Sequence, residues 1–406
     1  MNVFKMAWRN VLRNRRRSVV TIAAMAFALF VELLYAGLIP GYLRAMEEDI
    51  TQLEIGDVQI HAEGYRETPS IYTAIPDPDA VTAKLDALEG YPSAARLLGG
   101  GLAASGEFSA GIMLRAVDVE RDLKVCKVAG KVAKGAWLDP ANPKGVVVGK
   151  HLARTLAVEP GSEVLLLSQA TDGSMANDLY EVVGVLGSVA EATDRATIYM
   201  VDDAFRDLMV MPTGAHQIVV SRPRTASAAE AGDAVAAAVG EDLEVKNWKQ
   251  LMPIIAQMLD SVNGIIYILY FIIYVAVGIL VLNAMLMAVF ERIKEFGVLK
   301  AIGAGPLRVL FVIFIEAAIQ TMTAMAIGFA AALPGMWWLS NKGIDFGNVG
   351  GMNVMGVSMR KIWYGIYEPS VLAGPVIMLV VIVGMAVLYP AIKAAWISPV
   401  EAMRHR

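Results

Sequence analysis

The stretch VNGIIYILYFIIYVAVGILVLNAMLMAVF, from Val262 to Phe290, carries no charged residue. A hydrocarbon core of about 30 Å needs roughly 20 helical residues, so this run can cross a bilayer with residues to spare. A mean hydropathy of +0.52, with 18% charged residues in a chain of 406, also indicates a protein partly dissolved in lipid. The run therefore predicts a membrane-spanning helix.

Three further apolar runs have the same character. Ser18 to Ile39 carries only Glu32, Val309 to Leu339 carries only Glu316, and Val371 to Ile392 carries no charge. Basic residues precede the first run, as in a secretory signal, but the apolar part of a signal has only about 7 to 15 residues. We therefore expect a retained anchor and four transmembrane helices in all.

The basic residues near the run ends set the expected orientation, because Lys and Arg in short flanks prefer the cytoplasmic side. These basic residues form three clusters, and in a four-span topology all three clusters fall on the same side of the membrane. That side is predicted to be the cytoplasm, with both termini inside. The clusters are Lys5, Arg9, Arg13 and Arg15 to Arg17; Arg292, Lys294, Lys300 and Arg308; and Lys393, Arg404 and Arg406.

The block between the first two runs is expected to lie outside. From Arg44 to Asp260 it holds 19 Lys plus Arg and 32 Asp plus Glu, a balance of -13, whereas the whole chain has a net charge of -4. Such an acidic surface argues against nucleic-acid binding. The one cysteine of the chain, Cys126, lies in this block and is expected to be a buried free thiol.

The sequence of this block alternates between helix-like and strand-like patterns, which predicts an α+β domain with a β-rich insertion. Leu53 to Tyr65 alternates polar and apolar residues like a half-buried strand, and Asp77 to Leu88 has the apolar face of a helix. Short β-branched runs separated by Gly, Pro and Asp fill about 124–207 and predict the β-rich subdomain. An Ala-rich helix is expected at Ala226 to Val239.

Several motifs of enzymes are present only in part. GVVVGKH, Gly145 to His151, has three residues between its glycines and lacks the hydroxyl that follows lysine in a phosphate loop. The four histidines are scattered without metal-ligand spacing, so no metal site is expected. We predict no catalytic residues and no cofactor bound by this chain.

Polar residues at the membrane have two interpretations each. The first 17 residues place apolar and basic side chains on different faces. This pattern favours an amphipathic helix in the cytoplasmic interface, with its arginines toward lipid phosphates. The alternative is a basic flank that only sets the topology and has no defined helix. Glu32 and Glu316 are costly in hydrocarbon unless they face protein or water. Each is either paired inside the bundle or lines a hydrated or amphiphile-accepting cavity.

The segment ERIKEFGVLKAIGA, Glu291 to Ala304, carries a family motif between the second and third spans. Together with the order of spans, it resembles the permease subunits of the MacB, FtsX and LolC/LolE type of ABC transporter. The tail YPAIKAAWISPVEAMRH resembles the family ending, at Pro390, Ala391, Ala394, Pro399, Ala402, Met403 and Arg404. The loop motif of the family matches Glu291, Arg292, Glu295, Gly297, Ala301, Gly303 and Ala304.

The resemblance implies that this loop is a cytoplasmic coupling helix on which a separate ATPase, holding ATP and Mg, would push. Glu291 and Glu295 lie one turn apart and would repel each other on a helix, so we interpret them as facing an external basic partner. The candidate ATPase-coupling residues are Glu291, Arg292, Lys294, Glu295, Gly297, Lys300 and Gly303.

The length of the outer block and the lack of a fused ATPase make the layout closest to lipoprotein-releasing permeases. The expected function is ATP-coupled extraction of lipoproteins or lipid-linked cargo from the outer leaflet of the bacterial inner membrane. MacB-like mechanotransmission efflux of peptides or drugs, and FtsX-like signalling to a periplasmic hydrolase, remain alternatives. The expected partners are two ATPase subunits, a second permease chain, identical or related, membrane lipids, the lipoprotein or other amphiphilic cargo, and a periplasmic carrier.

Cargo would enter between the first and second spans of paired permeases, through a cavity open to the outer leaflet. Its candidate lining is Met25, Leu29, Glu32, Leu33 and Ile39 on the first span, with Ile266, Leu269 and Ile273 on the second. The predicted organisation is an interfacial helix at 1–17, spans at 18–41, 261–290, 307–339 and 371–392, a periplasmic domain at 42–260, the coupling helix at 291–306, a short outer loop at 340–370 and a cytoplasmic tail at 393–406.

Overall fold

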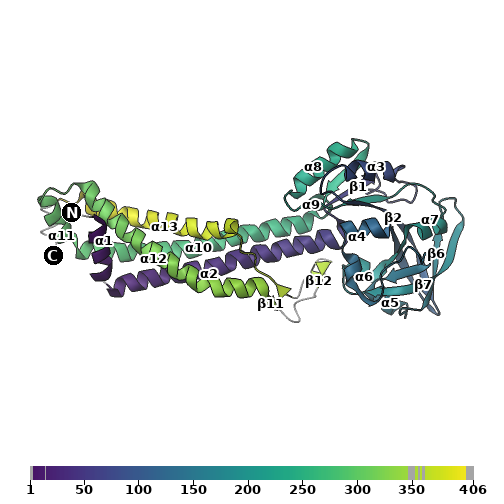
Figure 1. The fold of residues 1–406 in the computed structure, drawn as a ribbon, viewed down its shortest axis with the longest axis horizontal. Coiled ribbons are helices and arrows are strands. Elements are labelled where there is room, and N and C mark those ends of the chain that lie inside the picture. Colours follow the sequence, from purple (N-terminus) through teal and green to yellow (C-terminus); the bar gives the residue numbers. More distant parts are fainter. Residues whose placement is uncertain (1–2, 14, 346–352, 355–356, 359–361, 399–406) are drawn as a thin grey trace. The chain divides into compact units, whose positions relative to one another are not determined.

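The computed structural model describes residues 3–13, 15–345, 353–354, 357–358 and 362–398 (Figure 1). The chain divides into two compact units. The membrane unit comprises Met1–Leu43, Leu259–Asp345 and Ile362–Arg406. The sheet domain comprises Arg44–Met258 and Phe346–Lys361.

Four described helices are long and apolar enough to cross a membrane: α2 (Arg15–Ile50), α10 (Pro253–Glu291), α12 (Pro306–Asn341) and α13 (Pro369–Trp396). Each predicted span falls within one of these helices. However, α2 continues past the expected boundary at 41, and α10 begins before the expected start at 261. Two shorter helices, α1 (Val3–Arg13) and α11 (Ile293–Ala301), belong to the same unit.

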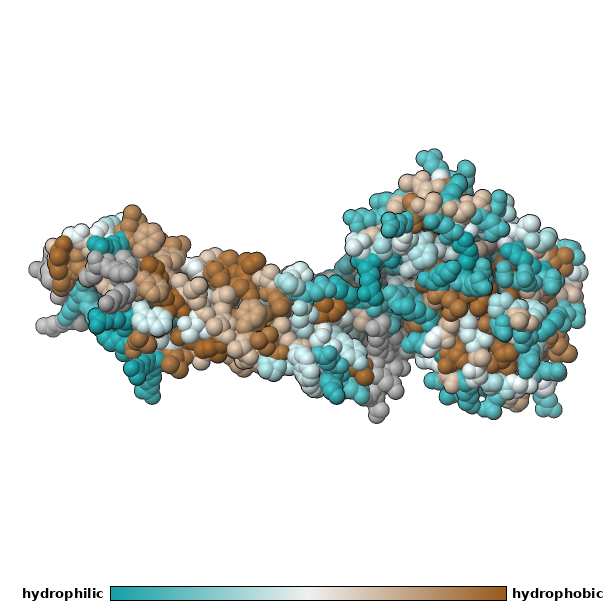
Figure 2. Space-filling view, viewed as in Figure 1, coloured by the Kyte–Doolittle hydropathy of each residue, from teal (hydrophilic) through white to brown (hydrophobic). Residues whose placement is uncertain are grey.

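The long helices pack through one apolar core that includes Leu29 of α2, Tyr274 of α10 and Leu379 of α13. Gly328 of α12 allows close approach to α2, because a Cβ there would lie 2.9 Å from the backbone oxygen of Ala26. Hydrophobic side chains also cover the outside of these helices (Figure 2). Apolar surface both inside and outside is typical of helices that face lipid.

The carboxyl end of α2 passes into a π-helical turn, Thr51–Ile55, before strand β1 (Val58–Ala62). The strand expected from Leu53 to Tyr65 is therefore wrong over its first residues, which are helical. Gly56 makes the change of direction in the left-handed region, with φ of 76°. The Glu54 side chain of this turn points into the sheet domain, where it meets Arg115 and Tyr199.

The sheet domain is built on a ten-stranded sheet with the order β10-β1-β9-β2-β3-β8-β5-β7-β4, while β6 pairs with both β2 and β7. Its other strands are β2 (Ser93–Ser105), β3 (Phe108–Val117), β4 (Val132–Gly135), β5 (Gly145–Val148), β6 (Glu163–Gln169), β7 (Met175–Leu186), β8 (Thr197–Val201), β9 (Gln217–Val220) and β10 (Leu243–Asn247).

Six of these strands form a closed circuit, because β2 pairs with β3, β3 with β8, β8 with β5, β5 with β7, β7 with β6 and β6 again with β2. The predicted β-rich stretch at 124–207 supplies four of the six. The circuit closes only through β2 and β3, which precede that stretch. A core that includes Leu114, Leu166 and Phe205 fills this part of the domain.

Three of the four remaining strands, β10, β1 and β9, carry helices α3 (Pro78–Asp86) and α8 (Ala228–Val239) over a core that includes Ile60, Leu85 and Val235. The expected α+β domain with a β-rich part is confirmed. Shorter helices are α4 (Val119–Val125), α5 (Lys150–Thr155), α6 (Glu191–Ala196), α7 (Asp202–Met209) and α9 (Trp248–Leu251), with a 3-10 turn at Val128–Lys131. Within 340–370, β11 (Ile344–Asp345) pairs with β14 (Ile362–Trp363), and β12 (Asn353–Val354) with β13 (Val357–Ser358).

Cys126 is a free, buried thiol, as expected from the sequence. Burial raises its pKa to about 11, although the Arg96 guanidinium opposes this effect. A thiol with such a pKa holds little thiolate at neutral pH and is a poor nucleophile. Its place is structural, beside Ala94, Val125 and Val219.

Candidate coupling site and buried ion pairs

Helix α11 forms a separate short element between α10 and α12. Arg292, with φ of -110° and ψ of 12°, interrupts the helical path after Glu291. Gly303, with φ of 98°, turns the chain after Ile302, and Pro306 begins α12 where its missing N–H is not needed. The family motif of the loop thus encodes a helix bounded by two turns.

Glu291 and Glu295 both pair with the N-terminal part of the same chain. Arg17 of α2 forms an ion pair with Glu291, and Arg13 of α1 donates to Glu295 Oε1 at 2.5 Å. Burial opposes ionisation of Glu295, but the hydrogen bonds from Arg13 and Arg292 outweigh it and hold its pKa below the ordinary value. Arginines of the same chain therefore offset the repulsion between the two acids, and an external basic partner for them stays a prediction.

Arg292 is buried and links three elements. Its Nη1 donates to Glu316 Oε2 of α12 at 2.9 Å, and its Nε donates to Glu295 Oε2 at 3.0 Å. Asn10 of α1 donates to the same Glu316 oxygen at 3.4 Å. Of the two interpretations of Glu316, the structure supports pairing inside the bundle.

The other predicted coupling residues divide between packing and exposure. Gly297 is buried, and Lys300 donates to the carbonyl oxygens of Ala395 and, at 2.7 Å, Ile397 near the end of α13. Lys294 is exposed, and so are Val298 (49%) and Ile302 (79%), at intervals of four residues. We call Lys294, Val298 and Ile302 the exposed α11 face.

The candidate cargo residues are mostly covered within this single chain. Met25, Leu29, Glu32 and Leu33 are buried in the helix bundle, and so is Ile266. Ile39 and Ile273 are half-buried, and Leu269 is exposed. Among the described residues, neither carboxyl oxygen of Glu32 has a hydrogen-bond partner. The residues remain predicted as cargo contacts, but most would reach cargo only if the bundle opened.

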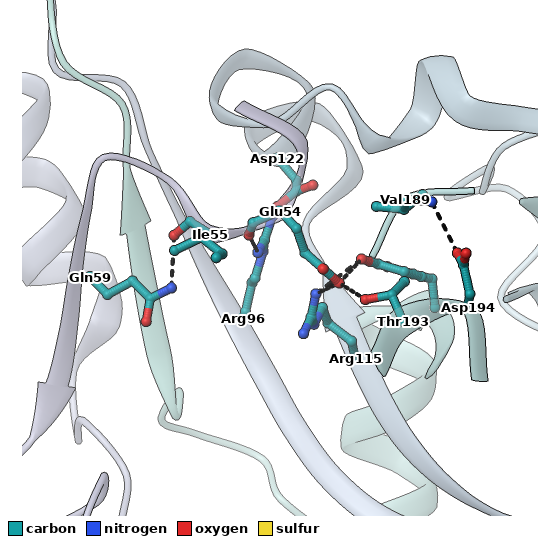
Figure 3. A network of polar contacts seen from close by, with 10 residues as sticks. Glu54, Ile55, Gln59, Arg96, Arg115, Asp122, Val189, Thr193 and Asp194 are labelled. Carbon is teal, nitrogen blue, oxygen red and sulfur yellow. Dashed lines mark hydrogen bonds and ion pairs between the residues drawn. The ribbon is translucent and has the colours of Figure 1, made fainter. Parts of the chain in front are cut away.

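A buried charge cluster in the sheet domain was not predicted (Figure 3). Glu54, in the π-helical turn, accepts hydrogen bonds at Oε1 from Arg115 of β3, Thr193 of α6 and Tyr199 of β8, the last at 2.7 Å. Its backbone oxygen accepts a bond of 2.5 Å from Arg96 of β2. The turn that follows α2 is therefore bound to three neighbouring strands.

Arg96 completes the cluster. It is 1% exposed, and its Nε donates to Asp122 Oδ1 of α4 at 2.7 Å. Burial opposes ionisation of Glu54, but Arg115 and the hydroxyls of Thr193 and Tyr199 outweigh that effect and lower its pKa. Figure 3 shows Arg96 and Arg115 approaching Glu54 from different strands. A single acid in an alternating run gave no sequence signal for this cluster.

Comparison with known proteins agrees with this architecture. A family model for the MacB-like periplasmic core domain matches residues 18–238, and a model for the FtsX-like permease C-terminal region matches residues 267–399. The first match alone covers more than half of the chain. This chain belongs to the MacB/FtsX family of ABC transporter permeases. The resemblance predicted from the α11 motif is confirmed, while tail positions Pro399, Ala402, Met403 and Arg404 lie outside the described residues.

Two solved structures are similar to parts of this permease. The periplasmic region of MacB from Actinobacillus actinomycetemcomitans has 13% identity and a TM-score of 0.36, over 52% of this chain and 92% of that chain. The extracellular domain of the noncanonic ABC-type transporter YknZ from Gram-positive bacteria has 14% identity and a TM-score of 0.33, over 47% of this chain and 99% of that chain. No curated protein gives a significant match. Permeases of this family work with ABC ATPase partners.

The pairing of α1 with α11 can be tested in the permease by charge reversal. Glu295→Lys is expected to speed amide hydrogen exchange in α1 about two- to fivefold, because an exposed pair is worth up to about 1 kcal/mol. Adding Arg13→Glu should restore slow exchange by re-forming the pair with opposite signs. Lys294→Gln is the control on the same helix. Equal exchange in all variants would contradict the Arg13–Glu295 contact.

Proposed function

We propose that this permease couples ATP hydrolysis by separate ATPase subunits to the extraction of lipoproteins or other lipid-linked cargo from the outer leaflet of a bacterial inner membrane. The exposed α11 face carries the proposal. Val298 and Ile302 present apolar side chains on and at the end of a short helix, which the buried Arg292–Glu316 pair and the exposed Arg13–Glu295 pair join to its neighbours. A partner that covers these side chains would gain hydrophobic contact and a rigid point of attachment.

In this proposal both termini and α11 lie in the cytoplasm, and the sheet domain lies in the periplasm. Two ATPase subunits holding ATP and Mg would dock on paired permeases, one on each α11. The second permease is identical or related. Lys294, beside the two apolar residues, would add attraction for an acidic rim on the ATPase.

Ion pairs and a continuous helix could carry a force from α11 to other parts of this chain. Arg292 and Glu316 connect the start of α11 to α12. Arg13 connects the first turn of α11 to α1, and Arg17 of α2 binds Glu291 at the end of α10, just before α11. Helix α2 is continuous to Ile50 and leads into the π-helical turn whose Glu54 is bound inside the sheet domain. We propose that displacement of α11 is transmitted along α2, which is the mechanotransmission expected of the family.

The apolar face of α10 is the proposed entry surface for cargo. Tyr267 (72% exposed), Ile268, Phe271 and Ile272 are exposed around the predicted cargo residue Leu269. Acyl chains or a second permease could cover them equally well in hydrocarbon. We place first contact with cargo here, and assign the buried residues around Glu32 to a later state in which the bundle has opened.

Val298→Asp combined with Ile302→Asp tests the docking surface. The double change is expected to weaken ATPase binding about 30- to 100-fold, because two central apolar contacts are replaced by charges. Co-purification of the ATPase with the permease in lipid nanodiscs measures this. Tyr72→Asp, a similar change at an exposed apolar residue of the sheet domain, is the control. Full ATPase binding by the double variant would contradict the assignment of α11.

The cargo class is tested with permease and ATPase in proteoliposomes that contain a triacylated lipoprotein. ATP-dependent release of the lipoprotein to a soluble acceptor supports extraction. Release of an entrapped peptide or dye, with the lipoprotein retained, would support efflux instead. ATP turnover without release of either would support signalling to a periplasmic hydrolase.

A further inference from the structure

The corner between α1 and α2 contains a hollow that the coupling role does not explain. It has an open volume of about 710 Å³ and is lined by Arg13, Arg15, Arg16, Arg17 and Val20. Arg13 ends α1, and the other three arginines begin α2. We call this feature the arginine hollow. A topogenic basic flank needs only net positive charge on one side of the membrane and does not require four guanidinium groups around one space.

The guanidinium donors of the arginine hollow are only partly used. Arg13 and Arg17 each bind one glutamate, Glu295 and Glu291. The structure gives Arg15 only a weak bond of 3.4 Å to the Leu12 carbonyl, and among the described residues it shows no ion pair for Arg15 or Arg16. Nη1 of Arg17 is buried without a hydrogen-bond partner. A buried donor without an acceptor is costly, so this group indicates a missing anion.

Guanidinium groups are well suited to phosphate, which accepts paired hydrogen bonds from their planar edges. The apolar part of the site favours a lipid over a free ion. Val20 lines the hollow, and it and Val19 are exposed, at 59% and 62%, at the start of a membrane-spanning helix. An acyl chain could lie along these valines while its headgroup occupies the hollow.

We propose that the arginine hollow binds the phosphate of an anionic phospholipid. A second step rests on the proposed function: the same lipid tunes the coupling of α11 to the ATPase. Arg13 and Arg17 hold Glu295 in the first turn of α11 and Glu291 at the end of α10, and both arginines also line the hollow, so a bound phosphate competes with the two glutamates for their donors. Bound lipid therefore loosens α11 from α1, and the end of α10, where α11 begins, from α2.

Native mass spectrometry of the full chain, purified in detergent and titrated with phosphatidylglycerol, tests the site. Arg15→Gln combined with Arg16→Gln is expected to lower affinity for this lipid about 30-fold, since each arginine contributes about a factor of five near anionic lipid. Arg9→Gln combined with Arg308→Gln removes the same charge from exposed residues outside the hollow and should change affinity less than threefold. Equal losses in the two double variants would overturn the site.

Two further measurements are needed. One distinguishes a phospholipid from free phosphate, and the other distinguishes lipid binding from the effect of the lipid on coupling. Inorganic phosphate that displaces the lipid at equal concentration would overturn the lipid assignment, as would equal binding of phosphatidylcholine. If Arg15→Gln/Arg16→Gln does not insert into membranes, Arg15→Lys/Arg16→Lys keeps the charge and should weaken binding by a smaller factor. ATPase stimulation by the permease should change with phosphatidylglycerol content in the native chain and not in the variant. Lost lipid binding with unchanged stimulation would overturn the second step alone, whatever cargo is moved.

Discussion

Replacing Glu54 with alanine is expected to destabilise the sheet domain by about 3–5 kcal/mol. The change leaves Arg115, whose side chain is only 16% exposed, without its carboxylate and removes the acceptor for Thr193 and Tyr199. Breaking a buried ion pair by removing one partner costs this much because the remaining charge stays desolvated. Hydrogen exchange of the sheet domain, measured in the full chain across a denaturant series, reports the loss.

Glu54→Gln separates charge from hydrogen bonding in this cluster. Glutamine can still accept from Thr193 or Tyr199, so its cost should be smaller than that of alanine. Because the folded pKa of Glu54 lies below its ordinary value of 4.5, its carboxylate adds stability that is present above that value and is lost as pH falls through the folded pKa. The glutamine variant should lack this part of the acid dependence. Equal stability of native chain, alanine variant and glutamine variant would exclude the cluster as a support.

Removing Arg292 alone should be the second large effect. Arg292→Met leaves Glu316 buried in the membrane unit with only the 3.4 Å bond from Asn10, and a loss of about 3–5 kcal/mol is expected. Arg292→Met combined with Glu316→Leu removes both charges and should recover most of this loss. Unfolding of the purified chain in mixed micelles gives the free energies of the native chain, both single variants and the double variant.

Arg308→Met is the matched control for this cycle, because Arg308 is exposed near the start of α12. Its cost should stay within about 0.5 kcal/mol. A double variant that loses as much as the sum of the two single variants would show that Arg292 and Glu316 are not coupled in stability.

The membrane helices could be predicted because long apolar runs have few alternatives. Their ends could not, since the segment GYLRAMEEDI, Gly41 to Ile50, continues α2 with a polar composition that resembles a domain surface. In the sheet domain, alternation located β1 but hid the π-helical turn before it. The closed circuit depends on β6 pairing with both β2 and β7, and strand composition does not report such long-range partners.

At the candidate coupling site, too, the position of a helix could be predicted from the sequence but its long-range contacts could not. The family motif located α11, but the partners of its acids lie far away in the sequence, on α1 and α2. A local rule about like charges one turn apart therefore led to an external partner for Glu291 and Glu295. For the first span, position along the helix gave no information about which face packs against the other helices. Met25, Leu29 and Leu33 were therefore expected to line a cavity, whereas they lie in the bundle core.

The closed circuit of strands has a mechanical consequence. Arg96, Arg115 and Tyr199, which bind Glu54, lie on β2, β3 and β8, three consecutive members of that circuit. A strand at an open edge can be peeled away one hydrogen bond at a time, whereas each strand of a closed circuit is bonded on both sides. A load arriving through Glu54 is therefore shared as shear across several ladders at once, and the domain would respond to it as one stiff body.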